Sequence, residues 1–364
     1  MLGRSLAELP TPALVLDLPA ARRNLARMVT ELEGLPAALR PHIKVHKCAE
    51  LARLQVEAGA VGICTATAWE AVAMVDAGID DVTVANQVVG RESLDALARA
   101  GAQARVCVAV DSMDNLADVA AAARRHDVEL GVLIEVDVGM DRCGTRSPQQ
   151  ALSLAELAVM LAGVRLDGVM GYEGQCTGEL DPARRAEMQR EALATLSATV
   201  GYLREAGHPC EVVSAGGTCT ASLTAADPIV TELQAGTYLV GDVFHELLGS
   251  DFELALTVHS SVLSARGTDF VVDAGRKGVG SELVAPRLAG GAELRFINEE
   301  HSGFRIERDS VPVVGAHVAL QPGYAPLTVN LYDAMYVVED GIVLDRWRVR
   351  ARHACPPWAL NPQW

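Results

Sequence analysis

Basic side chains are concentrated in the segment LRPHIKVHKC, residues 39–48. They are Arg40, His42, Lys44, His46 and Lys47. If the segment is a strand, alternate residues share a face, so Lys44 lies with His42 and Lys47 points the other way. A lysine that is desolvated at a strand end and surrounded by cations has a lowered pKa and becomes an amine nucleophile. We therefore favour Lys44 as a nucleophile, although a solvated basic loop explains this segment equally well.

The segment EVDVGMDRCG, residues 135–144, is a second place where an apolar stretch runs into charges and glycines. Arg142 is suited to an anionic oxygen of a cofactor or to a substrate carboxylate. The carboxylates of Glu135, Asp137 and Asp141 flank it and could balance its charge. The same residues would also form an ordinary turn after a strand.

A third segment, SAGGTCT at residues 214–220, has the composition of a phosphate site. It lies between an apolar stretch and a helix-like one, and its glycines allow backbone N–H groups to approach an anion closely. The next apolar stretch ends in QAGTYLVGD. The candidate phosphate contacts are Ser214, Gly216, Gly217, Thr218, Gly236 and Tyr238. Together with an amine nucleophile at Lys44, they predict a cofactor that carries a phosphate and a carbonyl group.

Short apolar stretches alternate with amphipathic ones from residue 18 to about residue 240. The expected strands are Ala38–Val45, Val61–Thr65, Asp81–Ala85, Arg105–Val110, Leu130–Val136, Leu166–Gly171, Glu211–Ser214 and Thr231–Val240. The expected helices are Leu18–Leu32, Ala49–Gly59, Trp69–Ala77, Glu92–Ala100, Leu116–Arg125, Gln149–Leu161 and Ala186–Ala206. This pattern predicts an α/β fold of the (β/α)8 TIM-barrel type, with an open doubly wound sheet as the alternative. In such a barrel, active-site groups lie at the carboxyl ends of the strands.

The sequence changes character after about residue 250, where β-rich stretches alternate with Gly, Pro and Asp-Gly turns. We therefore predict a barrel at residues 18–248 and an all-β C-terminal domain. The early stretch Thr11–Leu18 alternates like a strand and could join that domain. The β-rich domain would then contain residues 1–17 and 249–364.

Composition narrows the choice of partners and compartment. A formal net charge of −16 without a basic cluster argues against a nucleic-acid partner. No stretch approaches the roughly 20 apolar residues of a membrane span, and the first ten residues contain no apolar signal-like core. The eight cysteines lack paired spacings, which is typical of reduced thiols. We expect a cytoplasmic protein with neither a membrane nor a nucleic-acid partner.

Nine segments together resemble the D-threonine aldolase and D-serine dehydratase family of alanine-racemase-like enzymes (fold type III), which depend on pyridoxal 5′-phosphate (PLP). They are TPALVLDL, RPHIKVHKC, EVDVGMDRCG, GYEGQCTG, SAGGT, TELQAGTY, VVDAGRK, NEEHSGFRIE and TVNLYD. The resemblance as a whole spans Thr11 to about Arg352. The resemblance implies a PLP-binding barrel followed by a β domain. It also implies a small amino-acid substrate and a homodimer with active sites near the interface.

The resemblance assigns roles to individual residues. Lys44 matches the lysine that holds PLP as a Schiff base, with His42 beside it. Arg142 matches the arginine near the phenolic oxygen of PLP, and Tyr172 matches the tyrosine that faces the pyridine nitrogen. The phosphate contacts correspond to the residues named above. His301 lies in a segment that the family places close to the substrate, although a histidine in a surface turn would look the same.

This sequence departs from the family pattern at two places. Tyr324 and Pro326 stand where the family has a metal-binding His-x-Asp or His-x-Cys pair, and neither is a suitable ligand. We therefore predict that the usual divalent metal site is absent. His353 and Cys355 have the right mutual spacing but follow much later, and we interpret this match as accidental. Glu173 replaces the histidine that usually follows the tyrosine.

The predicted reaction follows from PLP, which delocalises charge released at Cα. We favour a lyase that cleaves or forms the Cα–Cβ bond of a β-hydroxy-α-amino acid, with Tyr324, Glu173 or His301 taking over the role of the metal. A metal-independent amino-acid racemase or epimerase and a D-serine-type dehydratase are the alternatives. A non-catalytic PLP carrier fits less well, because a carrier needs no second domain that encloses a substrate.

Overall fold

The computed structural model describes residues 2–306 and 311–352. Its backbone contacts divide the chain into two compact units. The barrel unit contains Val29–Lys44 and Ala49–Gly236. The β unit contains the chain up to Met28, the short segment Val45–Cys48, and Thr237–Arg350.

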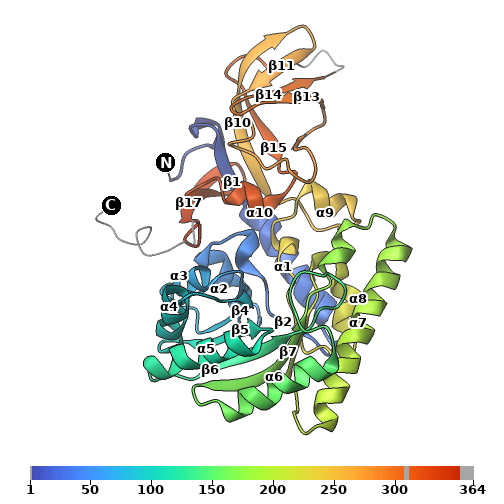
Figure 1. Cartoon of the computed structure of the whole chain (residues 1–364). Coiled ribbons are helices and arrows are strands. Elements are labelled where there is room, and N and C mark those ends of the chain that lie inside the picture. Colours follow the sequence, from blue (N-terminus) through green and yellow to red (C-terminus); the bar gives the residue numbers. More distant parts are fainter. Residues whose placement is uncertain (1, 307–310, 353–364) are drawn as a thin grey trace. The chain divides into compact units, whose positions relative to one another are not determined.

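Eight parallel strands form the centre of the barrel unit, in the order β2-β9-β8-β7-β6-β5-β4-β3. Their bounds are β2 Ala38–Leu39, β3 Ile63–Thr65, β4 Asp81–Gln87, β5 Arg105–Val110, β6 Leu130–Glu135, β7 Val164–Gly171, β8 Val212–Ala215 and β9 Glu232–Leu233. The ring is completed between its two ends by a parallel bridge from His42 to Cys64. Figure 1 shows the helices outside this ring. The predicted barrel is therefore confirmed, and the open doubly wound sheet is wrong.

Each strand of the barrel is connected to the next through helical segments that bury their apolar face. The connecting helices are α2 Ala49–Glu57, α3 Ala68–Val75, α4 Arg91–Gly101, α5 Met113–Arg125, α6 Pro148–Met160, α7 Pro182–Glu205 and α8 Ala221–Ala226. The helix α1, Leu18–Leu32, precedes β2, and its residues up to Met28 belong to the β unit. Four of the connecting helices are capped at the N-terminus by a side-chain oxygen that accepts a hydrogen bond from a backbone N–H group of the helix. The capping residues are Thr67, Ser112, Ser147 and Asp181. Such caps satisfy N–H groups that have no partner inside the helix.

Two of the expected strands are shorter than we predicted. The stretch Ala38–Val45 forms a strand only at its first two residues, and Lys44 lies in the 3₁₀ turn η2, Ile43–Val45. The expectation that residues 40 to 46 alternate along one strand is therefore wrong. The stretch Thr231–Val240 likewise contains only β9 and then the 3₁₀ turn η5, Thr237–Leu239. In both places the chain turns because it leaves the end of the barrel.

Charged side chains occupy part of the barrel interior. The Arg40 side chain, 3% exposed, forms ion pairs of 2.6 Å with Asp81 and 2.8 Å with Glu232. Arg105 bridges Asp81 and Asp167, with 3.0 Å to each carboxylate. Because a buried charge is costly without a partner, these residues depend on one another.

The β unit is built on a nine-stranded sheet in which β13-β14-β11-β10-β1-β16-β17 form one continuous order. The strands are β1 Ala13–Asp17, β10 Leu256–Arg266, β11 Asp269–Val272, β12 Arg287–Leu288, β13 Glu293–Ile297, β14 Ser302–Arg305, β15 His317–Gln321, β16 Ala334–Glu339 and β17 Ile342–Arg348. β15 pairs with β10 and β12. β1 lies between β10, its antiparallel neighbour, and β16, its parallel neighbour. Within the predicted stretch Thr11–Leu18, the residues of β1 are therefore a strand of this sheet.

Only short helices interrupt the described part of this unit after residue 236. They are α9, Val243–Leu247, and α10, Ala325–Val329. Among all the helices that the structure describes, none combines the length and the apolar character that crossing a bilayer requires.

Candidate active site

Lys44 lies where the chain turns out of the barrel after β2. Its backbone N–H donates to Nδ1 of His42 at 3.3 Å, so His42 holds the turn that carries the lysine. Burial lowers the pKa of the Lys44 amine, and the nearby Arg142 guanidinium lowers it further. Both causes disfavour the charged ammonium, so the amine is more readily neutral than an exposed lysine. A neutral amine is the form that can attack a carbonyl.

Tyr172, directly after β7, brings the predicted residues of the barrel unit together. The Lys44 Nζ atom lies 5.4 Å from the centre of the Tyr172 ring, and the Arg142 Cζ atom lies 5.8 Å from it. A Cβ at Gly217 would lie 3.5 Å from the Tyr172 ring, so the glycine-rich loop approaches the same ring. Lys44, Arg142, Tyr172 and Gly217 therefore share one end of the barrel, as the sequence predicted for the carboxyl ends of its strands.

The loop from Ser214 to Thr220 follows β8 and continues into the 3₁₀ turn η4, Thr218–Thr220. Gly216 has a φ of +86°, and a Cβ there would lie 2.5 Å from Leu233. Only glycine fits both conditions. Ser214 is fully buried, and its Oγ accepts a 2.9 Å bond from Gln234.

The N–H groups of both glycines already donate to side chains of the protein. Gly216 N–H donates to Glu173 at 3.1 Å, and Gly217 N–H donates to the Thr220 hydroxyl at 3.0 Å. The two glycines therefore shape a compact loop. This arrangement was not expected, because the sequence interpretation assigned those N–H groups to the phosphate.

Glu173 is 2% exposed and is bonded through both carboxylate oxygens. Besides the Gly216 N–H bond, it accepts a 2.8 Å bond from the hydroxyl of Thr224, on α8. The amide of Gln189 in turn donates to Thr224 Oγ1 at 2.7 Å and to the Thr220 carbonyl at 2.6 Å. Sequence reasoning missed Thr224 and Gln189, because a single polar residue on a helix gives no local signal.

A buried carboxylate, Glu135, ends β6 close to Arg142. It accepts a bond from the Gln87 amide. Burial raises the pKa of Glu135, while the Gln87 bond and the Arg142 charge act in the opposite direction. Asp137, by contrast, accepts bonds from the N–H groups of Gly139 and Asp141 and therefore shapes the turn after β6.

Tyr324 begins α10 in the β unit, and Asp242 holds that end of the helix. Asp242 Oδ2 accepts a 2.9 Å bond from the N–H of Ala325, and Oδ1 lies 2.6 Å from Nδ1 of His245. The Tyr324 ring stacks parallel to the His245 ring and meets Phe244 edge-on. Burial raises the pKa of Tyr324, and the Asp242 carboxylate raises it further. The phenol therefore remains protonated at neutral pH.

The other predicted residues of the β unit differ in exposure. His301 is exposed, in the loop before β14. A Cβ at Gly275 would lie about 2.5 Å from the backbone of this loop, so VVDAGRK and NEEHSG pack closely. Tyr238 is fully buried in η5, with its ring edge-on to Phe252. Gly236 ends the segment Ala49–Gly236 of the barrel unit.

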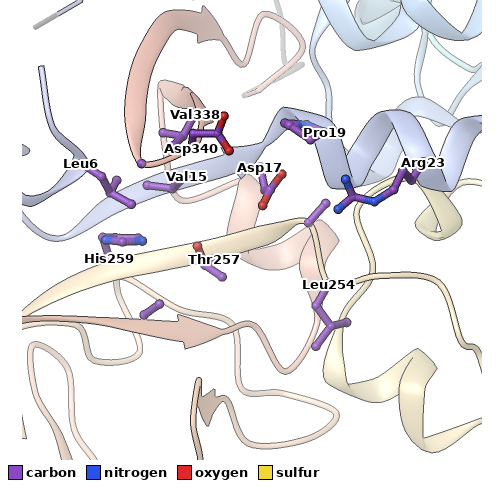
Figure 2. A pocket seen from close by; sticks show the side chains of 13 residues that line it. Leu6, Val15, Asp17, Pro19, Arg23, Leu254, Thr257, His259, Val338 and Asp340 are labelled. Atoms are coloured by element: carbon purple, nitrogen blue, oxygen red, sulfur yellow. The ribbon is translucent and has the colours of Figure 1, made fainter. Parts of the chain in front are cut away.

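A cavity of about 410 Å³ lies in the β unit and contains none of the predicted site residues. Figure 2 shows Val15 and Asp17 of β1 beside Thr257 and His259 of β10. Arg23, which also lines it, pairs with Glu253 at 2.7 Å.

Within residues 2–306 and 311–352, no group of three or more His, Cys, Asp and Glu side chains could hold a metal ion. Tyr324 and Pro326 occupy the start of α10. His353 and Cys355 lie outside the described residues.

An (α/β)8 barrel with a lysine at its carboxyl-terminal end, combined with a β unit, defines the class of alanine-racemase-like proteins. The family model described as "Alanine racemase, N-terminal domain" matches residues 16–243, and the model described as "Putative serine dehydratase domain" matches residues 255–338. The chain is 38% identical to a D-threonine aldolase from an Arthrobacter species over 96% of this chain and 94% of that protein. It is 33% identical to a 3-hydroxy-D-aspartate aldolase from Paracoccus denitrificans, with the same coverage.

A solved structure shows the same relationship. The crystal structure of D-threonine aldolase from Filomicrobium marinum matches with a TM-score of 0.93 and 33% identity, over 97% of this chain and 98% of that one. The chain therefore belongs to the D-threonine aldolase and D-serine dehydratase family of alanine-racemase-like PLP enzymes, as the sequence motifs indicated.

The family implies PLP, and the residues of the barrel unit fit this cofactor. Lys44 supplies an amine of lowered pKa for the aldehyde. Tyr172 supplies an aromatic ring, and Arg142 supplies a cation. The Lys44 amine and the Arg142 guanidinium each lie within 6 Å of the centre of that ring. At Gly216 the loop is too close to Leu233 and Thr224 to accept a larger residue, and Gly217 lies within van der Waals reach of the Tyr172 ring. A compact glycine loop after a late barrel strand is the usual place for a phosphate.

Proposed function

We propose that this protein is a PLP-dependent lyase that cleaves or forms the Cα–Cβ bond of a β-hydroxy-α-amino acid. The observation that carries the proposal is the buried Lys44 amine beside Tyr172 and Arg142, in a barrel of the aldolase family. When bound, PLP withdraws the charge that develops at Cα. The remaining steps depend on groups that this chain supplies.

In this proposal three residues of the barrel unit hold the cofactor. Lys44 binds its aldehyde, and the Arg142 charge both stabilises an anionic oxygen and keeps the Lys44 amine neutral. Tyr172 supports the ring, and His42 holds the Lys44 turn. The loop with Ser214, Gly216, Gly217 and Thr218, together with Gly236 and Tyr238, receives the phosphate.

The β-hydroxyl of the substrate requires a group that moves its proton. The raised pKa of Tyr324 makes it a hydrogen-bond donor toward that hydroxyl. Both oxygens of Glu173 already accept hydrogen bonds, so we do not assign the proton transfer to Glu173. His301 is exposed, and we propose it as the base of the carbon–carbon cleavage. The family resemblance supports this choice, because it places the segment of His301 close to the substrate.

We further propose that the reaction needs no divalent metal at residues 324 and 326, because a protonated tyrosine and a proline offer no suitable ligand there. The hydrogen bond from Tyr324 would replace the polarising effect of a metal on the substrate hydroxyl.

The decisive experiment compares wild type with Lys44→Ala and Lys47→Ala. We expect wild type and Lys47→Ala to develop the visible absorption of a lysine-linked PLP, and Lys44→Ala to lack it. We expect wild type to release aldehyde from D-threonine or D-phenylserine in the presence of a chelator. A colourless wild type after addition of PLP would refute the cofactor assignment, and silence toward β-hydroxy amino acids would refute the lyase assignment.

Dehydration of a D-serine-type substrate is the second candidate. The match of residues 255–338 to the serine dehydratase model favours it, and a protonated Tyr324 suits the departure of a hydroxyl group. Pyruvate formed from D-serine would identify this activity. Solvent deuterium entering Cα without aldehyde or pyruvate would instead identify a racemase or epimerase, and binding of PLP without any turnover would identify a carrier.

We also propose that the protein works in the cytoplasm as a homodimer with active sites near the interface. The catalytic barrel would comprise residues 18–248, and the β-rich domain residues 1–17 and 249–364. The family resemblance supports the dimer, and the pairing of β1 with β10 and β16 supports assigning the N-terminal residues to the β domain. Light scattering on the purified protein measures the oligomeric state.

A further inference from the structure

The carboxylate of Glu173 connects three parts of the barrel unit that surround the proposed phosphate position. It follows Tyr172 at the end of β7, accepts from Gly216 N–H after β8, and accepts from the Thr224 hydroxyl on α8. Its side chain is buried, so these bonds are not shared with bulk water. The loop is therefore held from one side by a single side chain.

The partners of Glu173 are themselves fixed. Gln189 on α7 donates to Thr224 Oγ1, which leaves the Thr224 hydrogen for Glu173. The same amide donates to the carbonyl of Thr220, in the loop. Glu173, Thr224 and Gln189 thus form one chain of hydrogen bonds in which each donor has an acceptor. Such a network specifies one geometry when all its members are satisfied.

Glycines on both sides of Tyr172 add steric precision to this arrangement. A Cβ at Gly174 would lie 2.6 Å from the Tyr172 ring, and one at Gly217 would lie 3.5 Å from it. When Glu173 holds Gly216, it therefore also sets the distance between the loop and the Tyr172 ring. In the proposed function the loop would receive the phosphate of the cofactor, and Tyr172 would support its ring.

We propose that Glu173 is a positioning residue for the cofactor's phosphate. This inference rests on the proposed function, and it differs from the acid–base role that the sequence suggested. Its carboxylate holds the loop in the conformation that receives the phosphate. The reacting atoms of the substrate are left to other groups.

The test measures the affinity of the cofactor-free protein for PLP and for pyridoxal, which lacks the phosphate. In Glu173→Gln, the amide can accept from only one of the two donors. We expect affinity for PLP to fall roughly tenfold to a hundredfold, the range for losing one partner of a buried charged hydrogen bond. Affinity for pyridoxal should change less than about threefold, because pyridoxal does not use the loop.

Variants of Thr224 provide an independent measurement. Thr224→Val keeps the shape but removes the hydroxyl, and it should reproduce the selective loss of PLP affinity. Thr224→Ser keeps the hydroxyl and should therefore bind PLP with the affinity of the wild type. Glu187→Gln is the matched control, because Glu187 is an exposed glutamate on α7 that pairs with Arg184. If Glu173→Gln does not fold, the Thr224 pair decides the question alone.

Two results would overturn the inference. One is an equal loss of affinity for PLP and pyridoxal, which indicates general damage to the barrel. The other is unchanged PLP affinity with a lost limb in the pH profile of turnover, which indicates an acid–base role. A wild type that fails to bind PLP would instead refute the proposed function itself.

Discussion

Tyr324 is the residue at which this chain departs most clearly from the metal-binding pattern of its family. Its position is fixed by Asp242, which bonds Ala325 at the start of α10, and by the rings of Phe244 and His245. A side chain held this firmly by its neighbours can present its hydroxyl in one direction. Because burial and Asp242 both raise the pKa of Tyr324, that hydroxyl acts as a donor over the physiological pH range.

Tyr324→Phe removes only this hydroxyl and keeps the ring contacts. We expect kcat on a β-hydroxy-α-amino acid to fall by roughly a hundredfold, a typical effect of losing one positioned hydrogen-bond donor at the reacting oxygen. The visible spectrum of bound PLP should stay the same. Steady-state kinetics with Tyr336→Phe as a control make the comparison, and unchanged turnover would show that Tyr324 only fills space.

At this scale the sequence identified the residue types but not all of their contacts. The grouping of Lys44 and Arg142 could be predicted because they lie in motifs at strand ends, where the fold brings such residues together, whereas Tyr172 was indicated only by the family resemblance. The bonding of Glu173 could not be predicted, because its partners Gly216 and Thr224 are 43 and 51 residues away. Local patterns contain no information on such distant hydrogen bonds.

At the scale of elements, β10 and β15 place two histidines on neighbouring strands. His259 lies opposite Ala319, and His317 lies opposite Ser261. Nδ1 of each ring is buried without a hydrogen-bond partner within the described residues. Burial lowers the pKa of His259 to about 4, and His317 adds to this effect. The folded protein therefore resists protonation of His259 while the unfolded chain accepts a proton near pH 6.5.

This difference predicts a loss of stability in acid. The pKa of His259 is lowered on folding, so its stabilising contribution is complete above about pH 6.5 and is lost as the pH falls toward 4. We expect His259→Phe to remove up to about 3 kcal/mol of this loss. Urea unfolding at pH 7 and pH 4.5 measures the effect, with His208→Gln as the control. An identical pH dependence in His259→Phe and wild type would contradict it.

Element bounds were predicted well where one physical signal dominates. The helix Leu18–Leu32 and the strand Arg105–Val110 have the predicted bounds. The segment around Lys44 was predicted as a strand because its apolar and polar residues alternate. Over so few residues, a turn can have the same sequence pattern as a strand. Only the tertiary contacts of the barrel end decide that the chain turns at Ile43.

At the scale of the whole molecule, the barrel depends on charges buried inside its ring of strands. Arg40 is the shared partner of Asp81 and Glu232. Removing one member of a buried ion pair leaves an uncompensated charge, which costs more than the pair contributes.

Arg40→Met should therefore destabilise the barrel by about 3–5 kcal/mol. Adding Glu232→Gln should restore part of this loss, because it removes the charge that Arg40→Met leaves without its partner, whereas Asp81 still pairs with Arg105. Chemical denaturation followed by circular dichroism measures both variants, and Arg91→Met, at an exposed arginine on α4, serves as the control. A cost for Arg40→Met no larger than that of the control would refute the interpretation of this ion network.

The position of β1 in the middle of the second sheet has a consequence for how the protein is made. Its residues are synthesised well before those of its two neighbours, which begin only at Leu256 and Ala334. During translation this apolar strand remains exposed while the barrel is synthesised and folds. An exposed strand edge attracts other chains. The sheet around β1 can therefore be completed only after β16 has been synthesised, and until then both edges of β1 are not covered by their native neighbours.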